Sequence, residues 1–162
     1  MNSQAFTLFH VALSLIGILT GFVMLFGFIG AKWNDVFIKI FLWTTLLTSV
    51  TGFMFPYKGV TPGIILGIIS VVVLAISFYA LYAGKTIGAW AKIFVVTTAI
   101  SQYLNFFVLI AQSFRKVPAL KALAPTQSEA PFKAAQGVAL LFFVILTILA
   151  AKNVRSKALQ SA

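Results

Sequence analysis

The sequence predicts an all-α fold, an integral membrane bundle of five transmembrane helices. Its 162 residues are 61% hydrophobic and 9% charged, with a mean hydropathy of +1.06, whereas soluble domains average about 45–50% apolar and about 25% charged residues. Five apolar runs fill most of the chain, and each can cross about 30 Å of hydrocarbon as a helix. We therefore expect a single membrane domain over residues 1–162.

The five expected spans follow from the apolar runs and from the capping residues at their ends. Asn34 and Asp35 form an N-cap for the second span, and Pro62 suits the first position of the third. Gly84 is expected just after the third span, and the link that it begins is so short that the third and fourth spans should form a contacting antiparallel hairpin. The expected spans cover residues 4–29, 36–55, 62–83, 87–114 and 129–151, joined before the last span by a loop over residues 115–128.

The first span carries no Lys or Arg before Lys32. A cleaved signal peptide has a positively charged start and an apolar core of about 7–15 residues, so we expect this helix to be retained. His10, near one end of the span, fits an interfacial hydrogen bond; a role as a haem or metal ligand lacks a visible second ligand.

Small residues form stripes on the first and third spans. Gly17 and Gly21 make a GxxxG pattern, which lets two helices approach closely. The pattern fits packing inside the bundle, or the seam of a homodimer. The predicted helix-packing residues are Gly17, Gly21, Gly63 and Gly67.

A polar face on the fourth span is the strongest functional hint. Its five polar residues fall within about 100° of one another on a helical wheel. Because amides facing lipid cost several kcal/mol unless hydrogen-bonded, this face should meet the Thr/Ser faces of the second and third spans, a hydrated cavity or ligand site, or a partner. With two threonines of the second span, the candidate cavity or interface is Thr44, Thr48, Thr98, Ser101, Gln102, Asn105 and Gln112.

The loop over residues 115–128 contains an amphipathic segment between Pro118 and Pro125, with Arg115, Lys116 and Lys121 around it. Such a segment fits the headgroup boundary. It is interpreted as a surface connector, with partner docking or cavity gating as alternatives. Ser128 is the expected N-cap of the fifth span, with Glu129 at the positive helix end.

Charge and residue usage exclude several classes of function. The formal charge is +10, from twelve Lys and Arg against two acids, and the cations flank the apolar runs, so they predict contact with anionic lipids and not with nucleic acid. The chain has no Cys and one His, and both carboxylates lie outside the apolar runs, which argues against thiol catalysis, bis-His haem sites and paired-acid hydrolysis. We expect no catalytic residues, no cofactor and no metal.

The distribution of cations also gives an orientation. Five spans place the two termini on opposite sides of the membrane, and by the positive-inside rule the more cationic side is the cytoplasm. The C-terminal side carries seven cations, Lys32, Lys39, Lys85, Lys92, Lys152, Arg155 and Lys157. The other side carries five, Lys58, Arg115, Lys116, Lys121 and Lys133. The C-terminus is therefore expected in the cytoplasm.

Three segments carry a resemblance to a known group of proteins: WTTLLTSVTGFMFP at 43–56, QSFRKVPAL at 112–120 and APTQSEAPF at 124–132. With them, nearly the whole chain resembles an uncharacterised family of small bacterial integral membrane proteins. The resemblance implies a location in the bacterial inner membrane. It supplies no catalytic residues.

The sequence is compatible with three functional interpretations. The leading one is a non-enzymatic accessory or scaffold component that associates with itself or with a partner complex. The alternative is a small channel or transporter for a neutral or polar solute that uses the polar face around Gln102 and Asn105. A lipid- or quinone-modifying enzyme is the third, with His10 as the one side chain suited to act as a base near neutral pH.

Overall fold

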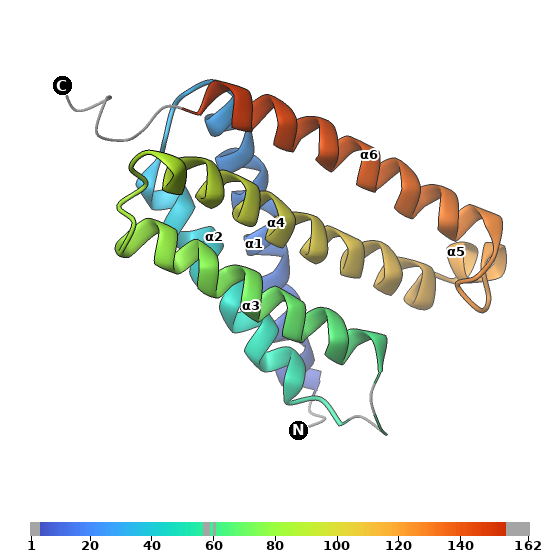
Figure 1. Cartoon of the computed structure of the whole chain (residues 1–162). Helices are drawn as coiled ribbons and strands as arrows, with labels where there is room; N and C mark the ends of the chain where they lie inside the picture. Colours follow the sequence, from blue (N-terminus) through green and yellow to red (C-terminus); the bar gives the residue numbers. More distant parts are fainter. Residues whose placement is uncertain (1–3, 57–58, 60, 155–162) are drawn as a thin grey trace.

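The computed structural model describes residues 4–56, 59 and 61–154, and throughout these residues the regular structure is helical (Figure 1). Five of the helices are long and apolar enough to cross a membrane, which confirms the predicted fold class of a multi-pass helical bundle. The helices are α1 (Gln4–Ile29), α2 (Asp35–Phe53), α3 (Pro62–Tyr82), α4 (Ala89–Lys116), the short α5 (Pro118–Leu123) and α6 (Ala130–Asn153).

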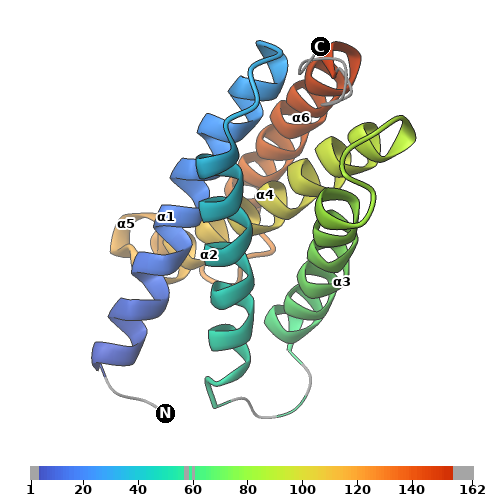
Figure 2. The ribbon, with the colours of Figure 1, turned by 90° about the vertical axis from the view of Figure 1, so that its left-hand side faces the viewer.

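Helix α4 is central to the arrangement. It packs against α3 on one side and α6 on the other, and α1 contacts α2, α4 and α6 (Figures 1 and 2). The predicted hairpin of the third and fourth spans is confirmed, because α3 and α4 are neighbours and the hydroxyl of Ser77 donates to Oγ1 of Thr97 over 2.8 Å.

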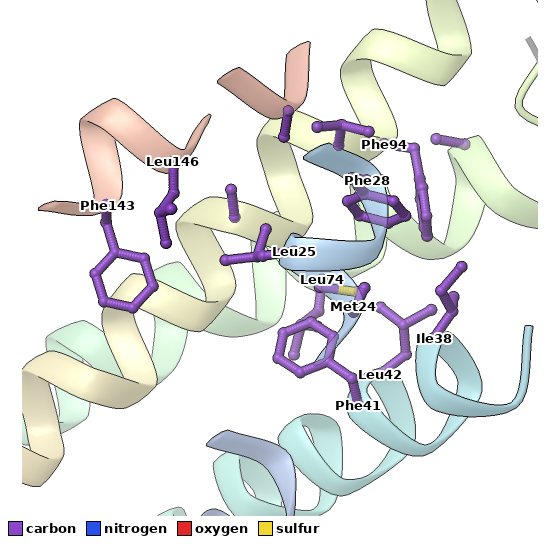
Figure 3. Close-up of a cluster of buried hydrophobic side chains, with 14 residues drawn as sticks. Met24, Leu25, Phe28, Ile38, Phe41, Leu42, Leu74, Phe94, Phe143 and Leu146 are labelled. Atoms are coloured by element: carbon purple, nitrogen blue, oxygen red, sulfur yellow. The ribbon is translucent and has the colours of Figure 1, made fainter. Parts of the chain in front are cut away.

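The apolar core is concentrated in one half of the bundle. Phe28, Phe41 and Phe94 come from three different helices and are fully enclosed, with exposed fractions of 1% or less. Figure 3 shows these side chains converging with Leu25 and Leu74, while Phe143 extends the cluster along α6. In every spanning helix the core residues lie in the half nearer to the end where α6 finishes. Close packing is therefore strongest at that end.

The turn between α3 and α4 depends on a close approach of Trp90 to Gly84. A Cβ on Gly84 would lie 2.5 Å from Cγ of Trp90, so only glycine leaves room for the indole ring. The positive φ angles that reverse the chain fall on Lys85 and Thr86, at 49° and 51°. Gly84 follows the C-cap residue Ala83, as expected. Its structural role is to leave room for the Trp90 side chain, and not to supply a positive φ angle.

Several predicted boundaries were wrong by one or two residues. Helix α2 ends at Phe53 because the next two amides, of Met54 and Phe55, bond three residues back and tighten the last turn before Pro56. Helix α3 ends at Tyr82, one residue before the expected end. Helix α4 begins at Ala89, after Gly88 with a φ of 56°, and continues to Lys116, and α6 covers Ala130–Asn153.

The predicted N-cap of the last span was also wrong. The capping residue is Glu129, and the amide of Ser128 donates to its carboxylate over 3.0 Å. The same carboxylate accepts from the amide and the hydroxyl of Thr126, at 3.1 and 2.7 Å. The bond from the Thr126 side chain is the main reason that the pKa of Glu129 is lowered. The carboxylate of Glu129 is therefore held within a tight turn. A separate difference from the prediction is that part of the expected loop over residues 115–128 forms the helix α5.

Candidate functional site

The polar face of α4 is directed into the bundle over most of its length. Thr98, Ser101 and Gln102 are buried, with exposed fractions of 0–1%. Asn105 is half-buried, and Gln112, near the end of the helix, is exposed. The face therefore changes from fully enclosed to open along α4, and within the described residues Gln112 does not share the interior surface of Thr98, Ser101 and Gln102.

The carboxamide of Gln102 bonds to the backbone of α1. Its Nε2 donates to the carbonyl of Ile18 over 2.8 Å. Gly21 makes this possible, because a Cβ there would collide with Oε1 and Cδ of Gln102. The Oε1 atom is buried against Gly21 and has no hydrogen-bond partner in the described part of the chain. Of the three alternatives for this face, bonding to the Thr/Ser faces of the second and third spans does not hold for Gln102, whose Nε2 bonds to α1.

The carboxamide of Asn105 does reach the second span. Its Nδ2 donates to Oγ1 of Thr45 over 3.1 Å. Gly17 lies beside this bond, where an added Cβ would be 3.2 Å from the hydroxyl oxygens of Thr44 and Thr45. The GxxxG glycines of α1 are thus both buried, and they face α2 and α4 of the same chain.

The hydroxyl groups of the predicted site are mostly satisfied within their own helices. Thr44 and Thr48 donate to carbonyls four residues earlier, at 2.7 and 2.8 Å. Thr98 and Ser101 do the same on α4, at 2.7 and 3.0 Å. Threonine and serine often bond in this way in membrane helices. Their protons are therefore not directed at a ligand.

The two predicted packing glycines of α3 have different surroundings. Gly67 lies against α2, where a Cβ would be 2.8 Å from Cε1 of Phe53. Gly63, in the first turn of the helix, is exposed. A packing role for the α3 stripe is thus supported at Gly67, and the isolated chain offers no enclosed surface at Gly63.

Three further carboxamides, which sequence reasoning missed, also donate to main-chain carbonyls of another segment. Gln136 of α6 donates to Phe107 over 3.1 Å, and Gln127 of the connection donates to Ala111 over 2.6 Å. Asn153 donates to Ile29 over 3.0 Å, tying the end of α6 to the end of α1. The need of Gln136 for a hydrogen-bond partner could have been predicted, because it is an amide within an expected membrane span.

His10 makes the expected hydrogen bond, and its partner is on α2. Its Nδ1 lies 2.8 Å from Oγ1 of Thr51 on α2. The ring also meets Phe55 edge-on, with 5.1 Å between the centroids. These contacts fix the imidazole between α1 and α2 near the ends of both helices. His10 therefore joins the two helices near the end where α1 begins.

Two open hollows on the surface of the described part of the chain do not involve the predicted polar residues. One, of about 210 Å³, lies between the start of α2 and the end of α3, with Asp35, Lys39 and Tyr82 in its wall. The other, of about 240 Å³, lies between α4 and α6. Comparison with protein-family models, curated proteins and solved structures finds no match. What this chain does must therefore be inferred from its own contacts.

We predict that Gly21→Ala destabilises the bundle, because the added methyl displaces the Gln102 side chain from its place beside α1. Overpacking of this kind costs about 1–3 kcal/mol. Thermal unfolding in mild detergent measures the loss. Gly137→Ala is the control, since a Cβ at that position on α6 meets nothing within 4 Å.

The double variant Gly21→Ala/Gln102→Ala separates this contact from a general effect on α1. Replacing Gln102 by Ala removes the carboxamide that the new methyl group would strike. The losses of stability caused by the two substitutions should therefore be clearly non-additive. Equal losses for Gly21→Ala and Gly137→Ala, or strictly additive losses in the double variant, would contradict the contact.

Proposed function

We propose that the chain is a non-enzymatic, multi-pass protein of the bacterial inner membrane that acts as an accessory or scaffold component. The observation that carries this proposal is the use of the polar side chains of α4. Gln102 and Asn105 bond to α1 and α2, and the neighbouring hydroxyls bond within their own helix. The polar groups at membrane depth thus hold the helices in register and are not arranged around a substrate.

The same contacts argue against the channel interpretation. A permeation path needs a row of accessible polar groups or a water-lined cavity. Gln102 is fully buried in direct contact with Gly21, so close packing interrupts the polar face near its middle. A solute moving along α4 would have to separate α4 from α1 at this point.

The outer face of α3 is the surface best suited to association within the membrane. Its large exposed side chains in the first four turns are all branched at Cβ, and they leave α3 less covered than the other spans. Branched side chains have few rotamers in a helix, so packing against another helix costs them little entropy. The face consists of Ile65, Ile68, Ile69, Val72 and Ile76.

We predict that the chain associates with itself or with a partner in native membranes through this face of α3. Ile68→Ala/Val72→Ala should weaken the association, because it removes methyl groups from the centre of the surface. Mass measurement after purification in mild detergent reads out the change. The control is Val138→Ala/Leu141→Ala on the exposed face of α6. A strictly monomeric chain with no co-purifying partner would refute the proposal.

Liposomes containing the purified chain should show no flux of small neutral or polar solutes above that of empty liposomes. The reason is the closed contact between Gln102 and Gly21. Flux that disappears in Asn105→Leu would instead establish the channel interpretation.

The proposal includes an orientation with the C-terminus in the cytoplasm and the α4–α6 connection outside, and it includes contact with anionic lipids at both surfaces. The flanking cations support both points, although Lys58, Arg155 and Lys157 lie outside the described residues. The chain lacks Cys, so a single introduced thiol reports its side without background. In intact cells Lys121→Cys should react with a membrane-impermeant thiol reagent and Lys85→Cys should not; the reverse result would invert the topology.

A further inference from the structure

The hollow between α4 and α6 is an open apolar groove on the surface of the bundle. The two helices lie side by side (Figures 1 and 2), and Ala99 and Phe143 form the buried floor. The hydroxyl of Thr147 in its wall donates back to the carbonyl of Phe143 over 2.6 Å. The rims are Val96, Ile100 and Tyr103 of α4, and Leu140, Val144 and Ile148 of α6.

Two lysines stand one helical turn beyond the same end of this groove. Lys92 precedes Val96 by four residues, and Lys152 follows Ile148 by four, so each lies on the same helical face as the rim residue. Because α4 and α6 are antiparallel, both lysines are at the end of the bundle where α4 begins. Both side chains are exposed.

The depth of the groove below the lysines matches one leaflet of a bilayer. At about 1.5 Å per residue, the groove begins about 6 Å from the lysines and ends, at Tyr103 and Leu140, about 17 Å from them. Half of a hydrocarbon core is about 15 Å. A chain that enters the groove from the lysine end would thus run to near the bilayer midplane.

We propose that this groove binds one acyl chain of an anionic phospholipid whose phosphate is held by Lys92 and Lys152. The volume of about 240 Å³ admits a flexible chain, but it cannot take a second helix, which is about 10 Å across. The cationic pair selects an anionic headgroup. Asp35, the acid at this end of the bundle, lines the separate hollow between α2 and α3.

The test is native mass spectrometry of the full chain released from nanodiscs that contain equal amounts of phosphatidylglycerol and phosphatidylcholine. The wild-type chain should retain phosphatidylglycerol preferentially. Lys92→Gln/Lys152→Gln should lower this retention by about fivefold per lysine, the effect expected of a cation near an anionic surface. The control Lys39→Gln/Lys85→Gln removes the same charge from the same end but away from the groove, and should change the retention little.

A second pair of variants tests the acyl-chain part of the site. Ile100→Trp/Val144→Trp fills the groove from two exposed rim positions, so it should reduce retention of lipid of either headgroup; Val138→Trp/Leu141→Trp on the outer face of α6 is the control. Equal retention of the two lipids, equal losses for the two lysine pairs, or full retention with a filled groove would overturn the proposal. Another molecule held in the groove in place of phospholipid would do so as well. If Ile100→Trp/Val144→Trp does not fold, the comparison of Lys92→Gln/Lys152→Gln with its control pair still tests the proposed site, because these lysines are exposed.

Discussion

Hydrocarbon offers a carboxamide no hydrogen-bond partner, and the arrangement of α1, α4 and α6 depends on this constraint. Gln102 and Gln136 lie within helices that can span a membrane, and each donates to a main-chain carbonyl of a neighbouring helix. Such bonds contribute only about 0.6 kcal/mol on average in membrane proteins. At Gln102 the contact is also specific in position, because the carboxamide occupies the space that the missing Cβ of Gly21 leaves beside α1.

The bundle combines two kinds of cohesion at its two ends. Where α6 finishes, interlocked aromatic and aliphatic side chains around Phe41 and Phe94 hold the helices together by close packing. Toward the α4–α6 connection, polar contacts such as Asn105 to Thr45 and His10 to Thr51 become more important. Association between helices gains little from the hydrophobic effect inside a bilayer, so dispersion and hydrogen bonding have to supply the cohesion.

Hydropathy and capping residues were enough to predict the five spans, the antiparallel hairpin of α3 and α4, and the need of the Gln102 and Asn105 amides for partners. The partner of Gln102 could not be predicted, because a carbonyl is present at every residue and has no sequence signature. The N-cap position of Glu129 was missed because Ser128 is the better N-cap by residue type, whereas Glu129 accepts bonds from the preceding residues Thr126 and Ser128 in a local turn. The groove between α4 and α6 depends on side-chain volumes at a crossing of two helices, which periodicity does not specify.

The bond from Gln102 to the carbonyl of Ile18 has a consequence for how such a chain can vary over evolutionary time. Replacing the side chain at position 18 leaves the acceptor in place, so positions 18 and 102 are free to drift independently although they touch. Positions 21 and 102 are coupled, because a Cβ at position 21 would collide with the carboxamide of Gln102, so an enlargement at the first position requires that side chain to move or to be shortened. In an aligned set of related sequences, the contact between α1 and α4 would therefore appear as covariation between positions 21 and 102. Position 18, which supplies the acceptor three residues earlier, would not covary with position 102.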